Sequence, residues 1–466
     1  MQAIVLTFDH LPVGFLGCYG NDWIETPNFD RLAAESVVFE QHFGENFSAT
    51  AGEHSWWTGC YHFPRGDAQP WNQTKLTEAL AAADVATWLV VERAAASTGP
   101  QPSCFDRVVE VAGKPQRSGM LKSSPFDQLV VRAQRSLEEA AATADRNLLL
   151  WLKSAGVPSP WVFIDDLTIK QVFQYMERIG PLLDAVVPEA EEKTEPEALG
   201  ESGAVAKHKS FVIDQSQLER NSTAVPLMID DTDLDDQRRR DWKISRSMYA
   251  AHVTQLDHCL GQLLSAIEKM PGAEERLLIV TAAAGDAFLQ SKALPGKFSQ
   301  LAEERIHVPL FIRGHGAQQA GRSQQLTQAV DLAATLIDWF GLPVDSMPRE
   351  GESLLPVMRG EQRSSAEREF VCLGAEGPVW GIRTEDFYLV QQEGDPANKT
   401  AEGSDTPARR LFVKPDDVWE VHNVADQFVA EADELAAELD RFIERAQSSI
   451  PMTDPGEDEP TSQSDA

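Results

Sequence analysis

Two pairs of adjacent residues in the first part of the sequence combine a carboxylate with a histidine, and both side chains can bind metals or transfer protons. Asp9 and His10 end the first apolar run, and Glu53 and His54 repeat the pattern of an acidic residue followed by histidine. Carboxylate and imidazole groups together can bind a transition metal. The alternative, which we favour, is a structural role in which backbone amides hold Asp9 at a strand end and His10 is a packed polar neighbour.

Other chemistry-bearing residues also allow structural interpretations. Lys297 follows a Pro-Gly pair and could contact an anion or lie on the surface. Asp231–Asp236 lack the spacing and the glycine of an EF-hand loop, which favours an exposed acidic loop. Trp56 and Trp57 could line an aromatic cleft, but their position inside a predicted helix favours core packing for at least one of them.

The spacing of apolar residues predicts strands that alternate with helices. Short apolar runs predict strands at residues 3–9, 37–39, 85–91, 148–153, 277–281 and 308–312. Helical periodicity and end signals predict helices at residues 26–35, 74–83, 126–146, 241–270 and 327–340. Thr26, ahead of Pro27, is expected to accept hydrogen bonds from first-turn amides. This alternation is typical of an α/β fold, a mixed, mostly parallel sheet between helices.

The chain is expected to divide into a large and a small unit. Residues 1–365 form the α/β domain, with an acidic surface excursion at about 184–240 that holds too few apolar residues to order itself by burial. Residues 366–447 form a C-terminal α+β subdomain. Its antiparallel strands are expected at 369–373, 379–383 and 387–391, and its helix at 424–447. Residues 448–466 carry five acidic residues and no basic one, which predicts a disordered tail.

The composition narrows the classes of function. The 466 residues carry a formal net charge of −32, which opposes binding to nucleic acid and to anionic membranes. No apolar run is long enough to span a bilayer, and the N-terminus lacks the pattern of a signal peptide. Five scattered cysteines without a CxxC pair argue against a disulfide framework. These features predict a cytoplasmic protein. They are compatible with a protein partner but do not identify one.

Six stretches, taken in chain order, resemble the sulfatase family of the alkaline phosphatase superfamily. The first joins Phe8-Asp9-His10-Leu11 to Leu16-Gly17-Cys18-Tyr19-Gly20-Asn21 and Thr26–Ala33. The others are Ser55–Tyr61, Leu149–Trp161, Leu277–Asp286, Lys297–Gly316 and Leu411–Val421. The resemblance covers most of the chain outside 95–125, 165–240 and the tail. It implies the fold of that family, with its small C-terminal subdomain.

The resemblance also implies a reaction centre. In the family, an Asp pair after the first strand and a later Asp-His or Asp-Asn pair hold one divalent cation. The nucleophile is a formylglycine made from Cys, or a Ser, within Cys/Ser-x-Pro-x-Arg at a helix start. The cation polarises the ester and lowers the pKa of the nucleophile. The helix N-terminus and basic side chains neutralise the sulfate.

At the matching positions this chain departs from the family pattern. Asp9 keeps the first carboxylate, and His10 replaces the second. The next positions read Ala49 for the nucleophile, Ala51 for the proline, Glu53 for the arginine, Pro158 for the histidine of the middle loop, and Ala283-Ala284 for the Asp-His pair. Lys297 alone keeps its type among the anion-binding groups. The Lys-x-His after the strand at 85–91 is absent, with Glu92-Arg93 nearby.

These substitutions predict a sulfatase-like pseudoenzyme with no catalytic residue and no cofactor. An alanine at position 49 cannot be a nucleophile, and Asp9 with His10 alone is a poor ligand set for a hard cation. Without a metal, only Lys297 and His10 could offset the negative charges of Asp9 and Glu53. The vestigial pocket is therefore expected to repel sulfate.

Three functions remain open, and fold alone does not decide among them. The first is a binding or scaffold protein. The second is an active metal-dependent hydrolase with a rearranged site, and the third is a partner subunit for an active paralogue. The hydrolase would use Ser48 or Thr50 for attack, and Asp9, His10, Glu53 or His54 to hold a divalent cation. Convergence of those four ligands on one point would favour the hydrolase, whereas their divergence would favour the binding protein.

Overall fold

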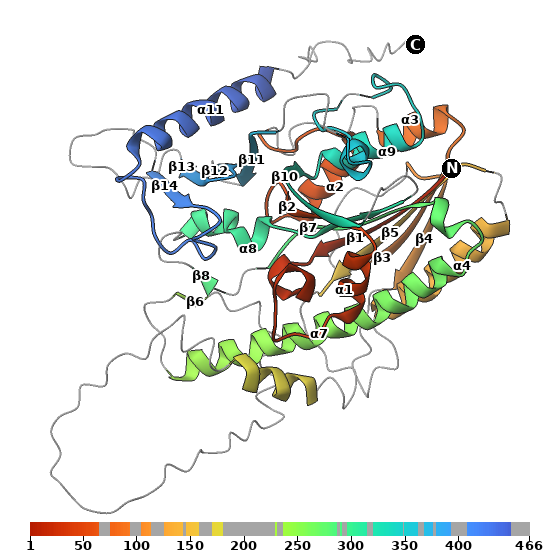
Figure 1. Ribbon diagram of the computed structural model, residues 1–466, viewed down its shortest axis with the longest axis horizontal. Helices are drawn as coiled ribbons and strands as arrows, with labels where there is room; N and C mark the ends of the chain where they lie inside the picture. Colours follow the sequence, from red (N-terminus) through yellow and green to blue (C-terminus); the bar gives the residue numbers. More distant parts are fainter. Residues whose placement is uncertain are drawn as a thin grey trace, which may run out of the picture.

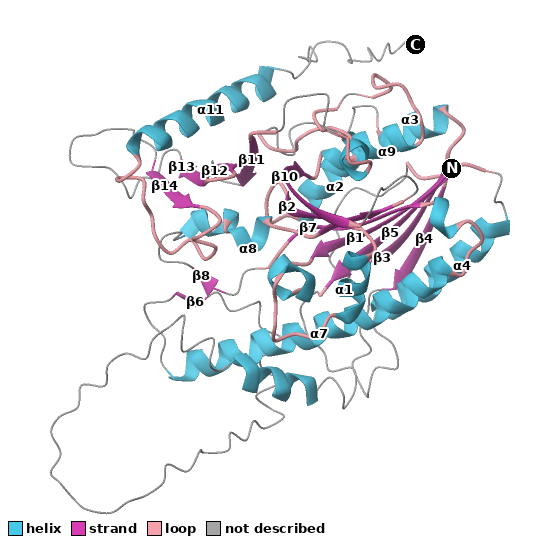
Figure 2. Cartoon of the chain, viewed as in Figure 1, coloured by secondary structure: helices cyan, strands magenta, loops and turns pink. Residues whose placement is uncertain are grey.

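The computed structural model describes most of the chain (Figures 1 and 2). The described residues are 1–64, 75–93, 104–112, 125–142, 146–157, 170–179, 229–230, 236–286, 289–290, 296–314, 320–347, 349–361, 368–375, 379–392 and 408–448. Within these ranges, no helix is both long enough and apolar enough to cross a membrane. Most of the predicted excursion, and the predicted tail after Ser448, lie outside the described residues.

An eight-stranded sheet forms the centre of the molecule, in the order β10-β2-β9-β7-β1-β5-β3-β4. The strands are β1 (Gln2–His10), β2 (Val37–Phe43), β3 (Ala86–Arg93), β4 (Arg107–Ala112), β5 (Leu148–Gly156), β7 (Leu277–Ala284), β9 (Leu310–Arg313) and β10 (Gly321–Gln328). β9 runs antiparallel to both of its neighbours, and the other pairs are parallel. The predicted mixed, mostly parallel sheet is therefore confirmed.

Helices cover both faces of this sheet, as the α/β prediction requires (Figure 1). On one face lie α1 (Pro27–Ala34), α4 (Pro125–Ala142), α7 (Asp236–Glu268) and the helix at 170–179. On the other lie α2 (Ala49–Thr58), α3 (Leu76–Ala82) and α9 (Asp331–Trp339). The shorter elements are η1 (Val13–Phe15), η2 (Gly17–Tyr19), β6 (Ile229–Asp230), η4 (Ala273–Glu275), β8 (Leu289–Gln290), η5 (Gly296–Leu301), α8 (Glu303–Ile306) and α10 (Leu355–Met358).

Side chains of β1 alternate between the two faces of the sheet. Ile4, Leu6 and Phe8 pack in the core beneath α7, whereas Ala3 and Val5 pack in the core beneath α2. A strand has a side-chain period of two, so the next residues continue this alternation. Asp9 therefore faces α2 and His10 faces α7.

Two strands of the sheet were not predicted. β4 and β10 are the edge strands, and β10 reads Gly-Arg-Ser-Gln-Gln-Leu-Thr-Gln, with half of its side chains buried. A polar strand gives no apolar run for sequence patterns to detect. β10 instead forms by pairing with β2, so the helix predicted from 327 begins only at Asp331.

The C-terminal unit is a four-stranded antiparallel sheet with one long helix. Its strands are β11 (Phe370–Ala375), β12 (Val379–Thr384), β13 (Phe387–Gln392) and β14 (Ala408–Val413), followed by α11 (Val429–Ser448). One face of this sheet packs on α11, and the other packs on η5 and Phe43 of β2. The predicted antiparallel sheet is confirmed. The fourth strand, β14, was not among the predicted strands.

The amides that begin α1 are capped from a distant helix. The prediction that Thr26 caps them is wrong, since its Oγ1 accepts instead from the backbone N–H of Gly17 at 2.9 Å. The carboxylate of Asp257 on α7 accepts from the backbone N–H of Asn28 and of Phe29, at 2.9 and 2.8 Å. It also accepts from the side chain of Asn28 at 2.8 Å. Asp257 thereby joins α1 to α7.

We expect Asp257→Ala to lower the free energy of unfolding by about 2–3 kcal/mol, because it leaves the buried amide of Phe29 and the part-buried amide of Asn28 without their acceptor. Urea unfolding followed by circular dichroism measures this loss. Asp345→Ala, the same change at an exposed position, serves as control and should cost less than about 0.5 kcal/mol. Equal stabilities for the two variants would contradict the capping role.

Candidate functional site

A lysine and two carboxylates meet where the sheet ends beneath α2. Lys153 Nζ on β5 lies 2.9 Å from Asp9 Oδ1 on β1 and 2.8 Å from Glu53 Oε1 on α2. All three side chains are mostly buried, with exposed fractions of 10, 19 and 14%. We name this group the Lys153 triad.

Strand register explains why these side chains meet. β1 and β5 are parallel neighbours, with Thr7 opposite Lys153. Leu149 and Trp151 pack in the core beneath α2, so Lys153 continues the same face of β5. Asp9 lies two residues beyond Thr7 on that face, and α2 brings Glu53 over the same spot. A lysine on the apolar face of a predicted strand could have indicated a buried ion pair, and Lys153 was not among the site residues identified from the sequence.

The charges of the triad shift one another's titration. Burial raises the pKa of Glu53, the neighbouring Asp9 raises it further, and the Lys153 ammonium acts in the opposite direction. Burial would lower the pKa of Lys153, but Asp9 and Glu53 together raise it above its ordinary value. Lys153 is therefore an ammonium at neutral pH.

This arrangement corrects the expected charge balance. Only Lys297 and His10 were expected to offset Asp9 and Glu53, and that expectation is wrong because Lys153 lies between them. The backbone of Lys297 belongs to η5, but its side chain lies outside the described part of the chain. The net charge of the triad is −1 rather than −2.

His10 takes part in a different group, on the opposite face of the sheet. Its Nδ1 lies 3.5 Å from Asp286 Oδ1 and 3.5 Å from the carbonyl oxygen of Gly285. Tyr249 of α7 donates its hydroxyl proton to Asp286 Oδ2 at 2.9 Å. Asp9 and His10 are adjacent in sequence and yet have different partners.

The remaining candidate ligand also points elsewhere. His54 is buried, with its Nδ1 3.4 Å from Thr58 Oγ1 and its ring 5.4 Å from that of His62. Of the four ligands considered for a rearranged hydrolase, only Asp9 and Glu53 therefore converge, and an ammonium lies between them. Trp56 and Trp57 are both buried against Trp151, which confirms their packing role.

Another carboxylate, Glu92, is buried at the end of β3. It accepts a hydrogen bond from Ser154 Oγ at 2.9 Å and one from the backbone N–H of Ala155 at 3.3 Å. Burial raises the pKa of Glu92, and these two donors oppose that rise. Glu92 was noted in the sequence only as a neighbour of a missing basic motif. In the structure it ties the ends of β3 and β5 together.

Both alanines at the end of β7 are enclosed, and Ala283 lies against α2. Ala283 and Ala284 are fully buried. Helix α2 packs so closely that a Cβ added at Gly52 would lie 2.6 Å from the Ala283 Cβ. The residue after β2 is equally close, since a Cβ added at Gly44 would lie 2.3 Å from the Ala283 oxygen. A side chain longer than alanine at position 283 would displace this backbone.

These residues do not fit a bound divalent cation. The ammonium of Lys153 stands against the oxygens of Asp9 and Glu53, and Ala283 offers no ligand atom. Across the described ranges, no group of three or more His, Cys, Asp or Glu side chains could hold a metal ion. Pro158, at the position of the middle-loop histidine, lies outside those ranges.

The start of α2 contains the hydroxyl groups considered as nucleophiles. Ser48 is the N-cap residue, but its side chain does not cap the helix, and its own N–H donates to Asn46 Oδ1 at 2.7 Å. Ser48, Ala49 and Thr50 are half-buried. Thr50 is rotated by about 100° from residue 49 on the helix, and Ser48 precedes the helix with extended backbone, so neither hydroxyl takes the direction of residue 49.

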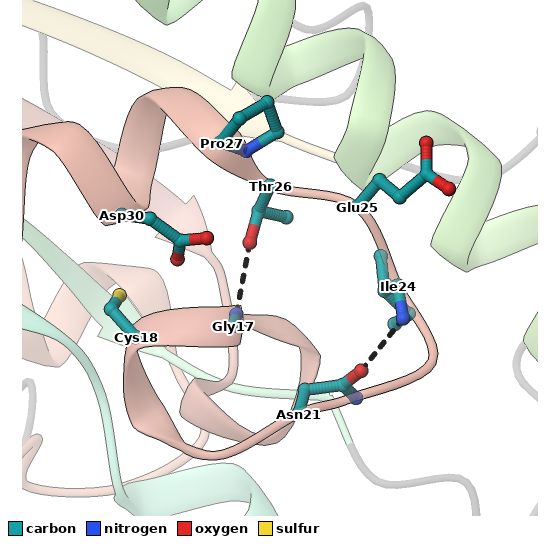
Figure 3. A pocket seen from close by; sticks show the side chains of 8 residues that line it. All are labelled: Gly17, Cys18, Asn21, Ile24, Glu25, Thr26, Pro27 and Asp30. Carbon is teal, nitrogen blue, oxygen red and sulfur yellow. Dashed lines mark hydrogen bonds between the residues drawn. The ribbon is translucent and has the colours of Figure 1, made fainter.

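A separate cavity of about 480 Å³ lies beside the start of α1 (Figure 3). Its lining includes Cys18, Glu25 and Asp30. Burial raises the pKa of Cys18 to about 12, and Asp30 adds to the rise, which disfavours the thiolate form at neutral pH. No residue of the Lys153 triad belongs to the lining, and the cavity therefore does not extend the site.

Comparison with known proteins gives a consistent family. The sulfatase family matches residues 2–342. The chain is 28% identical over 230 residues to an N-acetylglucosamine-6-O-sulfatase of Bacteroides thetaiotaomicron, covering 47% of this chain and 38% of that protein. It is 38% identical over 73 residues to human steryl-sulfatase, covering 16% of this chain and 12% of that one. The alignments thus span less than half the length of these curated relatives.

Solved structures agree with the fold throughout the chain. One, of a protein in complex with its substrate D-glucosamine-2-N,6-O-disulfate, aligns with a TM-score of 0.68 at 19% identity and covers 96% of this chain and 98% of that one. The phosphonate monoester hydrolase of Agrobacterium radiobacter aligns with a TM-score of 0.63 at 17% identity, covering 96 and 95%. At such identities the likeness establishes the fold alone.

We expect Lys153→Met to lower the free energy of unfolding by about 3 kcal/mol, because it leaves two mostly buried carboxylates facing each other without a cation. Urea unfolding at pH 7 measures the loss. Lys269→Met makes the same change at an exposed lysine and should cost less than about 0.5 kcal/mol. Adding Glu53→Gln to Lys153→Met should recover part of the stability. A single Lys153→Met variant as stable as the control would contradict the bridging role.

Proposed function

Since the chain belongs to the sulfatase family, we propose that it keeps the family's fold as a binding or scaffold protein and has lost the hydrolytic reaction. The observation that carries this proposal is the ammonium of Lys153 between Asp9 and Glu53. The family resemblance places a divalent cation beside the first of these carboxylates. Here a side chain of the protein supplies the positive charge instead.

An ammonium group does not replace the chemistry of a metal. A divalent cation binds an ester oxygen directly and lowers the pKa of a bound nucleophile. Lys153 carries one charge and lies in ion-pair distance of two carboxylates, so its charge is already neutralised. Lys153 therefore connects the ends of β1 and β5 to α2. Little of its positive potential remains to attract an anionic ester.

The start of α2 supports the same proposal. Ala49 has no nucleophilic atom, and Ser48 and Thr50 are offset from it by one residue. Glu53, where the resemblance implies arginine, gives the vestigial pocket a negative charge. The neutralised lysine reduces the repulsion expected from the sequence but does not reverse its sign. We therefore infer that sulfate binds no more tightly than millimolar.

A rearranged hydrolase finds no comparable support. It would need Asp9, His10, Glu53 and His54 around one cation, whereas His10 contacts Asp286 and His54 contacts Thr58. Sulfated sugars and sterols appear in the names of relatives, and phosphonate esters in the name of a structural neighbour. These substrates belong to those proteins. In this chain residue 49 is alanine, which has no atom that could attack such an ester.

We expect no turnover of aryl sulfate or aryl phosphate esters above background. The reason is that residue 49 offers no nucleophile and Lys153 stands in for the metal. Release of 4-nitrophenol from both esters, with and without Ca²⁺, Mg²⁺ and Mn²⁺, measures this. Turnover that disappears in Ser48→Ala or Thr50→Ala would show a rearranged nucleophile and defeat the proposal.

We expect Ca²⁺ and Mg²⁺ to leave the melting temperature of the wild-type protein unchanged. In Lys153→Ala the two carboxylates lose their cation, so these ions should stabilise the variant, by about 1.4 kcal/mol when an ion is present at ten times its dissociation constant. Differential scanning fluorimetry measures both responses, with Lys269→Ala as control. A wild-type protein that retains one equivalent of calcium after dialysis, or a variant that ignores the ions, would contradict the stand-in role of Lys153.

A further inference from the structure

The segment between β14 and α11 exposes an unusual concentration of apolar side chains. Nine large hydrophobic residues are exposed in the described part of the chain, and four of them fall within twelve residues. These are Val418, Trp419, Val421 and Val429, with exposed fractions of 51, 43, 53 and 56%. Single exposed apolar residues are ordinary, whereas several concentrated in one short segment make that segment a candidate interaction surface. We name these four residues the β14–α11 patch.

Hydrogen bonds fix the backbone beneath the patch. The carboxylate of Asp417 accepts from the backbone N–H of Val421 and of His422, each at 2.9 Å. Asn423 Oδ1 accepts from the N–H of Leu411 at 2.9 Å, and Val424 N–H donates to the Leu411 oxygen at 2.9 Å. The segment is thus tied to β14, and presenting its side chains costs little conformational entropy on binding.

One strained residue directs the apolar side chains outward. Glu420 has a φ of +54°, in the left-handed region that side chains other than glycine disfavour. Its carboxylate is buried, accepts from the backbone N–H of Glu303 at 3.1 Å and lies 3.5 Å from Lys414 Nζ. This anchor keeps Glu420 inside the molecule while Trp419 and Val421 on either side of it stay in water. Strain held by such an anchor is typical of functional segments.

Acidic residues outnumber basic ones around the patch, although Arg409 of β14 pairs with Asp433 and Lys414 lies beside Glu420. Residues 416–434 contain seven carboxylates, of which Glu420 is buried, and no lysine or arginine. A partner surface with basic residues therefore complements this rim. A second copy would instead bring acidic residues against acidic ones, and two chains of net charge −32 repel each other.

We propose that the β14–α11 patch is the docking surface for a basic protein partner, which receives Trp419 in an apolar pocket and surrounds it with lysine or arginine. The inference rests on the proposed binding function and names its partner by chemistry. Exposed tryptophan is the residue type most enriched among those that dominate binding energy. Figure 1 shows the segment at the outer end of the small sheet, beside α8 and away from α2.

Random dodecapeptides displayed on phage provide the probe, panned against the immobilised full-length protein. We expect enriched peptides to combine apolar residues with lysine or arginine. We expect synthetic versions of these peptides to bind Trp419→Ser and Val421→Ser with an affinity at least about tenfold lower than for the wild type. Val344→Ser, at another exposed valine, is the matched control and should bind like the wild type. Binding should also weaken as salt rises from about 0.05 to 0.5 M.

Three results would overturn the proposal. They are no enrichment, enriched peptides without basic residues, and peptides that both patch variants bind as well as the control does. Sedimentation velocity adds a fourth, because wild-type dimers that vanish in Trp419→Ser would assign the patch to a second copy. Ester hydrolysis by the same proteins would contradict the proposed function but not the patch, so the two failures are distinguishable.

Discussion

The ammonium of Lys153 is the charge on which the end of the central sheet depends. Asp9 on β1 and Glu53 on α2 are both acidic and mostly buried, and without a cation between them their repulsion would oppose the packing of the helix on the strand. A lysine from the adjacent β5 supplies that cation within a single folded chain. A positive charge is therefore still needed at the position where the family resemblance places a metal. Lys153 supplies that charge, but it does not supply the catalytic chemistry of a metal.

The same device appears a second time, in the C-terminal unit. Lys414 is buried beside Glu303 of α8 and Glu420 of the segment after β14. Burial raises the pKa of Glu420 to about 8, whereas Lys414 and His307 lower that of Glu303 against the effect of its burial. Both lysines join elements that are far apart in sequence. Removing either would leave carboxylates stranded, so each ion pair acts as a connection between parts of the fold rather than as a source of net stability.

The alternation of a β-strand explains why the candidate ligands do not form one site. Asp9 faces α2 and meets Lys153, while His10 faces α7 and meets Asp286. On β7, close packing against Gly52 leaves room for nothing larger than Ala283. A metal centre would need ligands to gather at the very end of these strands, and each residue instead has a local partner. The molecule's exposed binding feature lies elsewhere, at the β14–α11 patch.

The sequence by itself determined six of the eight strands of the central sheet, the main helices against it and the presence of a small antiparallel unit. Buried parallel strands leave continuous apolar runs, and helices against them leave a 3.6-residue period, so both are local signals. Edge strand β10, which is polar, left no such signal and formed only by pairing with β2. Likewise, the sequence identified Asp9 and Glu53 as candidates but not their partner. Only the tertiary structure decided that Lys153 joins them and that Asp257 caps α1. Contacts between residues a hundred or more positions apart depend on strand register and helix packing, which no local pattern encodes.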